Sequence, residues 1–387
     1  MKNTETARDL LIALHATPAL DRGAVCLLAR DAERWAGRSP RAAGALAAEL
    51  GLPRDQVRRA LLAAADAPRL ADRERERAEA HGGRLLTRLD PGYPEALGHL
   101  SLQPPVLCVR SRLSQPGQLG GLLAGPAVAI VGSREAGEYG LEAAELFARE
   151  LAAHGVAVIS GFARGIDAAA HRGALAAPAG RTVAVLGCGL GVDYPRGHAR
   201  LGDQIAARGA LVTEFPCGTT PRAWHFPVRN RIIAALSAGT LVVEATARSG
   251  SLVTVRHALD LGREVWAVPG RIIDPRAAGP NALIRDGAAL VQQPRDVLES
   301  LGLRPAAPVA RGSAETVRSD TIQRERPPGL ASTVLDGLDP GGDEATPEAL
   351  AERAAVTVDR VLAALLELEL GGWIVRRPGP RFARAGG

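Results

Sequence analysis

Lysine is almost absent from this sequence of 387 residues: Lys2 is the only one, and arginine carries nearly all of the positive charge. The P-loop of many nucleotide hydrolases needs a lysine after its glycines, so that class of ATPase is excluded. Schiff-base catalysis also needs a lysine amine, which only Lys2 could supply. Aromatic residues make up 3% of the chain. The core must therefore be built from alanine, leucine and valine.

Cysteine and long apolar runs are scarce as well. The four cysteines have no paired spacing: Cys26, Cys108, Cys188 and Cys217. Zinc sites and disulfide frameworks use closely spaced pairs, so we expect neither a metal nor disulfides, and a reducing compartment. No apolar run reaches the ~20 residues that span a bilayer, and the N-terminus has no secretory signal. These absences predict a cytoplasmic protein without membrane contact.

Positive charge is in excess, with a net charge of +5 and a sequence pI near 9.5. Such arginine usage is typical of a GC-rich genome. Whatever the reason for this usage, the planar guanidinium group binds phosphate through two hydrogen bonds and stacks on bases. The composition therefore favours a phosphate-bearing partner.

The middle of the chain alternates between apolar strands and helices. Strands are expected at 127–132, 156–160, 182–187, 210–215, 240–245 and 264–270, and helices at 142–153, 230–238 and 252–261. Continuous apolar strands separated by helices predict an α/β fold, an extended Rossmann-like doubly wound parallel sheet covered on both faces. Such sheets bind ligands at the C-terminal ends of their strands.

Composition also predicts the division into domains. Residues 1–82 form short helices with glycine and proline breaks, which indicates an N-terminal helical domain. The Rossmann-like domain covers 83–302, and a flexible linker rich in proline, alanine and arginine covers 303–330. Residues 331–387 combine two helices with a small hairpin around Pro378-Gly379-Pro380, the pattern of a C-terminal winged-helix domain.

The second helix of this last domain is acidic. It carries Asp359, Glu367 and Glu369 against one basic residue, Arg360, whereas a helix that reads DNA is normally basic. Basic residues gather only in the hairpin, at Arg376, Arg377, Arg381 and Arg384. Partner binding and weak contact with a nucleic-acid backbone are the two alternatives for this domain.

Three turns that follow predicted strands have the composition of phosphate-binding turns. Their candidate residues are Gly132, Ser133 and Arg134 after the first strand, Gly161, Arg164 and Gly165 after the second, and Arg248, Ser249, Gly250 and Ser251 after the fifth. Glycine lets the backbone approach an anion, and the free N–H groups of the following helix point at it. The alternative for the first turn is a tight turn with a solvent-exposed Arg134.

The stretch Trp224–Arg231, WHFPVRNR, places aromatic and basic residues directly before a predicted helix. Its candidate contacts are Phe226, Arg229, Asn230 and Arg231. Aromatic rings interleaved with arginine suit stacked bases and phosphates, as in single-strand nucleic-acid binding. A loop packed on the sheet edge is the alternative, and the neighbouring phosphate-type turns favour the first interpretation.

A dinucleotide cofactor is not expected, because the first turn lacks G-x-G and the second strand ends in Ser160-Gly161 instead of an acid. Asp167 and His171 lie four residues apart on one helix face. They could form an acid/base pair, but such a pair more often fixes a turn by hydrogen bonds. Glu244 does not suit a phosphate ligand, and we expect it to orient backbone or a nearby arginine, or to contact sugar or base. We expect no cofactor and no catalytic residue.

Six ordered blocks resemble the DprA (Smf) family of DNA-processing proteins, from about Tyr93 to Leu290: IVGSREAGEYG, SGFARGIDAAAHRGAL, FPVRNRII, EATARSGSLVT, GREVWAVPG and GPNALIRDGA. More loosely, the N-terminus resembles a sterile-alpha-motif-like or helix-hairpin-helix-like extension, and the C-terminus a winged-helix extension. The resemblance implies a homodimer without enzymatic activity that binds single-stranded DNA on its Rossmann-like domain. It also implies that this recombination mediator loads RecA onto the strand during natural transformation.

By position, the resemblance assigns the DNA contacts to the three turns and to Phe226–Arg231. Family members often have a basic residue shortly before this Phe-Pro pair, where the chain has Ala223 with Arg222 beside it, which puts that contact in doubt. The dimer surface is expected near 281–290, with Leu283, Ile284 and Leu290 as its apolar residues. The implied partners are single-stranded DNA, RecA, single-strand-binding protein and a second copy of the chain.

Two other classes are the alternatives. Nucleotide phosphoribohydrolases, which are enzymes, also have a Rossmann-like fold with phosphate-binding turns. They are marked by a P-G-G-x-G-T pattern and a catalytic glutamate. This chain has Pro269-Gly270-Arg271, and Glu244 lies elsewhere. A transcription regulator would bind DNA through the winged helix. The acidic second helix of that domain disfavours this alternative. Mononucleotide hydrolysis would identify the enzyme, and sequence-specific duplex binding the regulator.

Overall fold

The computed structural model describes residues 2–17, 20–113, 118–303, 327–338, 345–370, 373–377 and 381–384. Contacts divide the chain into two units, Met1–Ala307 and Pro308–Gly387. Most of the predicted linker at 303–330, and the Pro378-Gly379-Pro380 turn, lie outside the described residues. The domain boundary expected between residues 82 and 83 lies inside the first unit and stays a prediction.

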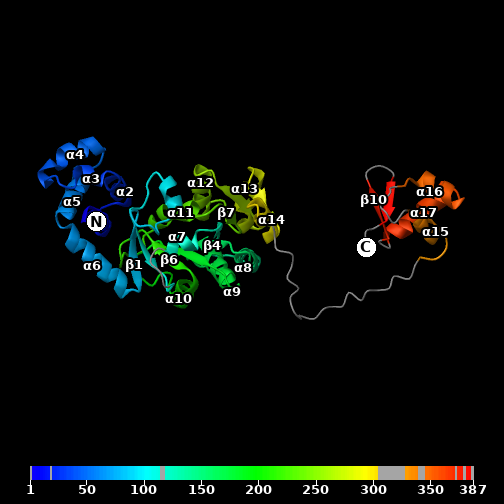
Figure 1. Cartoon of the computed structure of the whole chain (residues 1–387), viewed down its shortest axis with the longest axis horizontal. Helices are drawn as coiled ribbons and strands as arrows, with labels where there is room; N and C mark the ends of the chain where they lie inside the picture. Colours follow the sequence, from blue (N-terminus) through cyan, green and yellow to red (C-terminus); the bar gives the residue numbers. More distant parts are fainter. Residues whose placement is uncertain are drawn as a thin grey trace. The chain divides into compact units, whose positions relative to one another are not determined.

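Helices begin the first unit. They are α1 (Lys2–Ala16), α2 (Arg22–Arg30), α3 (Ala32–Trp35), α4 (Ala43–Leu50), α5 (Arg54–Ala65) and α6 (Ala67–Ala80), with a 3-10 turn at Pro40–Ala42. Asp21 caps α2 because its carboxylate accepts a hydrogen bond from the Ala24 amide at 2.7 Å. The apolar faces meet in one cluster that contains the buried Trp35 and also Val106 of the sheet. These helices therefore pack beside the β1–β2 edge of the sheet (Figure 1).

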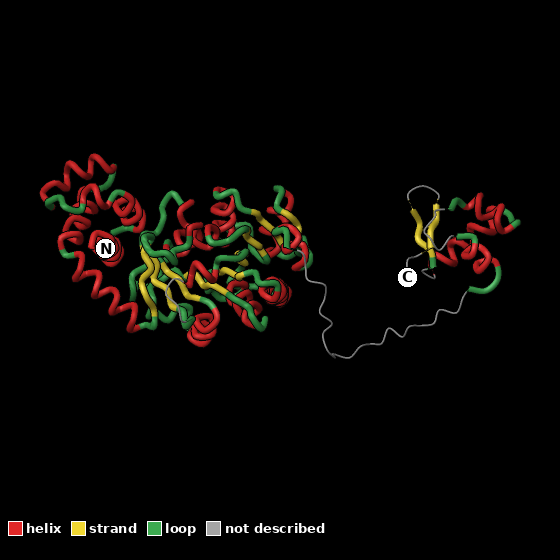
Figure 2. Tube along the Cα trace, in the orientation of Figure 1, coloured by secondary structure: helices red, strands yellow, loops and turns green. Residues whose placement is uncertain are grey.

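The described residues form one large sheet of nine strands in the order β1-β2-β6-β5-β4-β3-β7-β8-β9. Figure 2 draws the strands in yellow, with helices in red around them. The strands are β1 (Gly83–Thr87), β2 (Val106–Arg110), β3 (Ala127–Val131), β4 (Ala157–Ser160), β5 (Thr182–Val185), β6 (Ala210–Thr213), β7 (Gly239–Val242), β8 (Glu264–Ala267) and β9 (Ala289–Leu290). Neighbours among β3–β9 pair in parallel, whereas β2 is antiparallel to β6 and to β1. The predicted parallel α/β sheet is confirmed, with two antiparallel strands added at one edge.

Both faces of this sheet are buried. Val128 and Ile130 of β3 belong to one apolar cluster, while Ala129 and Val131 belong to another. Alternate side chains of a strand point to opposite faces, so a strand buried on both sides reads as a continuous apolar run. The covering elements are α7 (Gln118–Leu122), α8 (Glu138–Ala153), α9 (Ile166–Ala176), α10 (Ala199–Arg208), α11 (His225–Ala235), α12 (Ser251–Asp260), α13 (Ala278–Arg285) and α14 (Pro294–Ser300), with 3-10 turns at Glu95–His99 and Pro275–Ala277.

The strand order creates a topological switch point. The chain passes from β3 to β4 and β5 on one side, and later to β7 and β8 on the other. Helices that follow β3 and β7 therefore leave toward opposite faces, and a crevice opens at the carboxyl ends of these strands. The turns after β4, β3 and β7 meet at this crevice.

One predicted boundary is wrong in a way that matters for the site. The helix expected from Asn230 begins five residues earlier, at His225, so that most of the WHFPVRNR stretch is helical. Pro227 does not break α11 because it lies in the first turn, where its missing N–H would have no intrahelical partner. Phe226 and Arg231 therefore stand on a rigid helix instead of a loop.

The second unit contains α15 (Leu330–Asp336), α16 (Pro347–Ala354), α17 (Val358–Leu370), β10 (Ile374–Arg377) and β11 (Arg381–Arg384). The Thr346 hydroxyl caps α16 by accepting a hydrogen bond from the Ala349 amide at 3.4 Å. Strands β10 and β11 pair antiparallel, and Ala345 bridges to Phe382. The predicted pair of helices and hairpin are confirmed, with α15 before them. Of the four basic hairpin side chains, only that of Arg381 lies within the described residues, and it is exposed.

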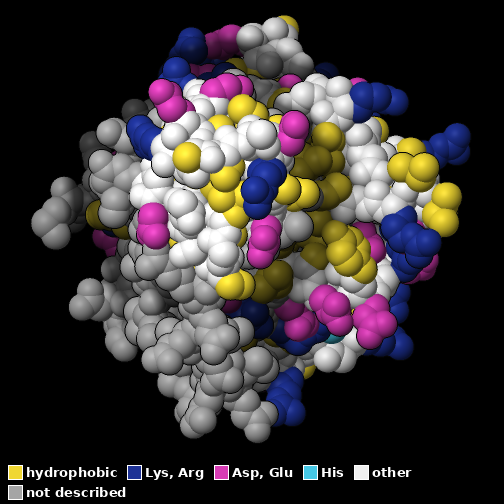
Figure 3. All heavy atoms as spheres, turned by 90° about the vertical axis from the view of Figure 1, so that its right-hand side faces the viewer, with side chains coloured by type: hydrophobic (Ala, Val, Ile, Leu, Met, Phe, Trp, Pro, Cys, Tyr) yellow, Lys and Arg dark blue, Asp and Glu magenta, His cyan; other side chains and the backbone are white. Residues whose placement is uncertain are grey.

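Surface charge is mixed. Figure 3 shows basic and acidic side chains interspersed with hydrophobic ones on the face toward the viewer. Every helix within the described residues is too short or too polar to cross a bilayer.

Candidate functional site

A cavity of about 410 Å³ lies at the switch point, and we call it the switch-point pocket. The turns after β3, β4 and β7 and the first turns of α11 and α12 enclose it. Its lining residues are Val131, Gly132, Ser133, Arg134, Glu135, Ala163, Asp167, Phe226, Pro227, Arg229, Asn230, Ile233, Thr246, Ser249, Gly250, Ser251 and Thr254. Parallel sheets bind ligands at this place, and the sequence pattern predicted a ligand site at the C-terminal ends of the strands.

The turn after β3 forms one wall. A side chain at Gly132 would meet Ile166 and the Glu244 carbonyl within 3 Å, so a residue without Cβ is required there. The Ser133 amide donates to the Glu244 carbonyl at 2.6 Å. The buried Glu244 carboxylate accepts from the Gly137 amide at 2.8 Å, just before α8. Glu244 therefore holds the backbone of this turn, one of the roles expected for it.

The turn after β4 packs against the first one. Gly165 has a φ of 76°, in the left-handed region, and a Cβ there would collide with the Ser133 carbonyl. The Ile166 amide donates to that same carbonyl at 3.1 Å. A Cβ at Gly161 would likewise collide with the side chains of Asp167 and Arg229. Gly161 and Gly165 therefore shape the pocket without lining it.

Arg229 supplies a buried positive charge beneath the pocket. Its side chain is 4% exposed and donates to the carbonyls of Gly161 and Val185 and to the Asn230 amide oxygen. Burial lowers the pKa of Arg229 to about 10, which keeps it charged at neutral pH. Burial raises the pKa of the Asp167 carboxyl, and the nearby Arg229 opposes that change. The two groups fix the β4–α9 turn to α11 and place opposite charges beneath the cavity.

Arg134 is the exposed cation of the pocket. Its guanidinium carbon lies 4.8 Å from the centre of the Phe226 ring, within cation–π range. Within the described residues, its side chain has no carboxylate partner. Its backbone N–H likewise donates to no acceptor there. Charge, an open amide and an aromatic face thus converge in one place.

The turn after β7 closes the opposite wall. The hydroxyls of Ser249 and Ser251 lie 2.8 Å apart at the start of α12. The Asn230 side-chain amide donates to the Gly250 carbonyl at 3.2 Å, which ties this turn to α11. Hydroxyl groups and the N-terminal amides of a helix are donors that suit an anion.

The pocket brings together nine of the fourteen residues predicted from sequence: Gly132, Ser133, Arg134, Phe226, Arg229, Asn230, Ser249, Gly250 and Ser251. It does not include Gly161, Gly165, Arg164, Arg231 and Arg248. Arg164 and Arg248 are exposed beside it. Sequence reasoning missed Thr246 and Thr254, because single threonines carry no distinguishing pattern.

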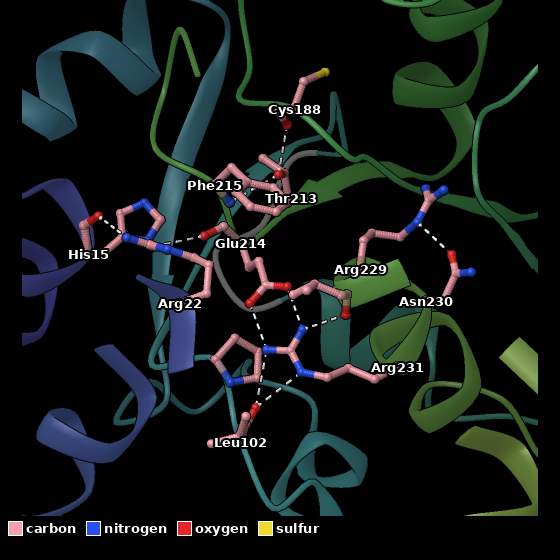
Figure 4. Close-up of polar contacts among 12 residues, drawn as sticks. His15, Arg22, Leu102, Cys188, Thr213, Glu214, Phe215, Arg229, Asn230 and Arg231 are labelled. Atoms are coloured by element: carbon pink, nitrogen blue, oxygen red, sulfur yellow. Dashed lines mark hydrogen bonds and ion pairs between the residues drawn. The ribbon is translucent and has the colours of Figure 1, made fainter. Parts of the chain in front are cut away.

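Arg231 is an ion-pair partner and not a pocket residue (Figure 4). Its two Nη groups donate to both carboxylate oxygens of the buried Glu214, and further bonds reach the carbonyls of Leu102 and Val228. Burial alone would lower the pKa of Arg231, but the Glu214 carboxylate raises it. With its donors occupied, Arg231 has none left for a phosphate. The expectation of a DNA contact at Arg231 is therefore corrected to a structural role.

The same polar cluster reaches the N-terminal helices. Arg22 of α2 donates to the Glu214 carbonyl at 3.3 Å and to the His15 carbonyl at 3.2 Å (Figure 4). Burial, followed by the charge of Arg22, holds the pKa of His15 well below its usual range. The N-terminal helices are thus hydrogen-bonded to Glu214, which directly follows β6 and also binds Arg231 of α11.

Asp167 and His171 are both occupied by structural bonds. The Asp167 carboxylate accepts from the Ala163 amide at 3.2 Å. His171 Nδ1 and the Thr182 hydroxyl lie 2.7 Å apart in the interior. Burial lowers the pKa of His171 to about 3. Their geometry fits the fixing of a turn, the second of the two roles considered for the pair. Within the described residues, no cluster of three or more His, Cys, Asp and Glu side chains is arranged to hold a metal.

The residues expected at the dimer surface lie at the β9 edge of the sheet, opposite the β1 edge. Leu283 and Ile284 of α13 are half-buried, and Leu290 of the edge strand β9 is 48% exposed.

Comparison with known proteins identifies the family. The model of DNA recombination-mediator protein A matches residues 84–302, and the model of the DprA winged helix domain matches residues 323–380. Protein Smf of Escherichia coli strain K12 is 47% identical over 256 residues, which are 65% of this chain and 66% of that protein.

Solved structures agree with this assignment. DNA processing protein A (DprA) of Streptococcus pneumoniae is similar with a TM-score of 0.64 and 32% identity, over 75% of this chain and 97% of that one. The structure of DNA processing protein A from Helicobacter pylori is similar with a TM-score of 0.50 and 27% identity, over 57% of this chain and 95% of that one. The expected resemblance and winged-helix fold are confirmed, and the chain belongs to the DNA recombination-mediator protein A family, also called DprA or Smf.

Proposed function

We propose that this chain is a recombination mediator that binds single-stranded DNA in the switch-point pocket. The observation that carries the proposal is Arg134, an exposed guanidinium 4.8 Å from the Phe226 ring, in a pocket that the turns after β3 and β7 also line. Arginine binds phosphate and aromatic rings stack on bases, the two elements of single-strand recognition. The relative from Helicobacter pylori is described as having a unique single-stranded DNA binding mode.

Single strands fit this arrangement better than duplex. Bases of a duplex are already stacked and cannot place a face against Phe226 without being unstacked. A guanidinium and an aromatic face, the groups that carry the proposal, suit phosphates and the π-face of every base. The proposed DNA contacts are Gly132, Ser133, Arg134, Phe226, Arg229, Asn230, Ser249, Gly250 and Ser251, with Gly161 and Gly165 shaping the turns and Arg164 and Arg248 at the rim. Binding should therefore be independent of sequence.

The mediator acts by binding energy and not by catalysis. His171 is fully buried and does not line the switch-point pocket, and the Asp167 carboxylate accepts a hydrogen bond from the Ala163 amide, which favours structural roles for both. We infer that the chain holds single strands for a RecA-type recombinase, in competition with single-strand-binding protein, during natural transformation in the cytoplasm. A homodimer through β9 and α13 would present two strands together and raise their effective concentration.

The test is the rate of RecA filament formation on single-stranded DNA coated with single-strand-binding protein. We expect the chain to accelerate it, Arg134→Ala to lose most of the acceleration, and Arg58→Ala, an exposed arginine on α5, to keep it. An unchanged rate with the wild-type chain would refute RecA loading. Hydrolysis of nucleotides or DNA that is abolished by Asp167→Asn would show an enzyme of the phosphoribohydrolase type or a related class.

A further inference from the structure

Two buried thiols lie side by side in the apolar cluster that the sheet shares with α6 and α10. The Sγ atoms of Cys108, in β2, and Cys217, in the turn after β6, are 3.4 Å apart and share a hydrogen bond. We propose that Cys108 and Cys217 form a reversible disulfide when a peroxide oxidises them, and that this bond staples the turn before α11 to β2. The inference does not depend on DNA binding.

The fold brings together two cysteines that are 109 residues apart in the sequence. Antiparallel pairing of β2 with β6 places Cys108 opposite Thr213, near the end of β6. The chain then turns, because the Thr219 amide donates to the Pro216 carbonyl at 3.1 Å. Cys217 is a central residue of that turn. Strand and turn therefore present their thiols to each other, although the spacing of the cysteines gives no sign of a pair.

Closing the disulfide needs only a small movement. A sulfur–sulfur bond is about 2.05 Å long, so the two Sγ atoms must approach by about 1.4 Å. Among the described residues, no atom lies within 4 Å of the place that a Cβ would take at Gly218, the neighbour of Cys217 in the turn. The turn has space there to adjust. The Cys217 amide stays directed at the Glu74 carboxylate of α6, to which it donates at 2.7 Å.

Accessibility decides which thiol is oxidised first. Cys108 is fully buried, whereas Cys217 is 7% exposed. The hydrogen bond with Cys217, followed by burial, raises the pKa of the Cys108 thiol, so Cys108 keeps its proton at neutral pH. The thiolate is the reactive form of cysteine. Cys217 is therefore the thiol that a small oxidant such as hydrogen peroxide meets first, and Cys108 is the resolving thiol.

The oxidation proceeds in two balanced steps. The Cys217 sulfur attacks one peroxide oxygen, the O–O bond breaks, and the other oxygen leaves as water with the thiol proton, so that Cys217 becomes a sulfenic acid. The Cys108 sulfur then attacks the sulfenic sulfur, an S–S bond forms, and the hydroxyl leaves as a second water with the Cys108 proton. The two thiols lose two electrons, which the peroxide gains. A dithiol reductant reverses the reaction by exchange.

The disulfide would enclose the part of the sheet that builds much of the site. Strands β3, β4, β5 and β6 lie between Cys108 and Cys217 in the chain. A crosslink stabilises a protein mainly by restricting its unfolded state, and more so when the closed loop is long. Neither Cys108 nor Cys217 is among the residues that line the switch-point pocket. Oxidation should therefore make the folded chain harder to unfold without changing the lining of that pocket.

Peptide mapping tests whether the bond forms. The full chain is treated with hydrogen peroxide under native conditions, its remaining thiols are alkylated after denaturation, and it is digested with trypsin. Cleavage after arginine separates the four cysteines into different peptides: Cys26 in 23–30, Cys108 in 89–110, Cys188 in 182–196 and Cys217 in 209–222. We expect a crosslink between the peptides of Cys108 and Cys217, which dithiothreitol removes, while the other two cysteines are alkylated.

Three results of this mapping would overturn the inference. The first is complete alkylation of all four cysteines after a peroxide treatment that fully oxidises free cysteine. The second is a crosslink that joins Cys188 to either member of the pair. The third is a sulfinic acid on Cys217 with Cys108 still alkylated, because it would show that Cys108 does not resolve the sulfenic acid.

Urea denaturation tests what the bond does. The oxidised wild type should unfold at a higher urea midpoint than the reduced wild type, and dithiothreitol should restore the lower value. Cys217→Ala should lose this shift and Cys188→Ala should keep it, which is a matched control because both cysteines are buried in the same cluster. Met1 is the only methionine, so methionine oxidation leaves the core unaltered.

The wild-type comparison decides the outcome even if Cys217→Ala fails to fold, because it needs no substitution. An equal urea midpoint for the reduced chain and the crosslinked chain would refute the staple. A peroxide-induced shift that persists in Cys217→Ala would refute it as well. Neither measurement involves DNA, so the proposed function and this inference can fail separately.

Discussion

Replacing Arg231 tests whether this arginine stabilises the fold or binds DNA, because the two roles predict changes in different quantities. Arg231 and Glu214 have side chains that are 9% and 2% exposed, and both carboxylate oxygens accept bonds from the guanidinium. In Arg231→Met, a similar apolar volume remains but the Glu214 carboxylate is left buried without its main partner. Breaking a buried ion pair from one side costs about 3–5 kcal/mol. We expect the low end of that range, because Arg22 lies near and partly compensates the charge.

The assay is urea denaturation followed by circular dichroism. The expected result for Arg231→Met is a loss of about 3 kcal/mol in the free energy of unfolding, with single-strand affinity unchanged in the protein that remains folded. In the double variant Arg231→Met/Glu214→Leu, the loss should be smaller than the sum of the single losses by about 0.5–3 kcal/mol, as expected for residues in contact. The Arg22 guanidinium keeps its bonds to backbone carbonyls in that variant.

Two outcomes would refute this reasoning. An unfolding free energy within about 0.5 kcal/mol of the wild type would place Arg231 among ordinary surface residues. Undiminished stability with a loss of single-strand affinity would return Arg231 to the DNA contacts that the sequence pattern predicted.

Three further predictions concern the pocket, the interior and the second unit. Arg134→Ala should weaken single-strand binding by about 1–3 kcal/mol, the range for charge-assisted hydrogen bonds, with an unchanged thermal transition; unchanged affinity in fluorescence titration would make Arg134 a surface residue. Because burial lowers the pKa of His171 from 6.5 to about 3, the unfolded chain binds a proton below pH 6.5 that the folded chain does not. Stability should therefore fall as the pH falls, by about 2 kcal/mol at pH 5 from this group. In His171→Gln, the urea midpoints at pH 7.5 and pH 5 should differ less than they do in the wild type. If they differ as much as in the wild type, other groups cause the acid sensitivity. Deletion of 331–387 should leave single-strand binding mostly intact, because α17 carries Asp359, Glu367 and Glu369; a loss beyond about tenfold, or about 1.4 kcal/mol, would show that the basic hairpin contributes.

The sheet and its ligand edge were predictable because their signals are local. A strand buried on both faces, such as Ala127–Val131, is a continuous apolar run in any context. Glycines at positions where a Cβ collides, such as Gly132 and Gly165, stand out in the same way. Parallel pairing then brings turns that are distant in sequence to one edge, which is why the switch-point pocket could be anticipated.

The errors arise where a residue's role depends on distant partners. Arg231 binds Glu214, 17 residues away, and the Leu102 carbonyl, 129 residues away. Within its own stretch it is indistinguishable from Arg229, which does line the pocket. Charge and ring type can be read from a sequence, whereas their partners cannot.

The most direct test of the central claim is a comparison of single-stranded and blunt duplex DNA of equal length and composition across a salt series. We expect tighter binding of the single strand at every salt concentration, with log affinity falling by about 0.7 per log unit of salt for each phosphate neutralised. Arg134→Ala should narrow the difference between the two forms. Equal or tighter binding of the blunt duplex by the wild-type chain would contradict single-strand recognition in the switch-point pocket.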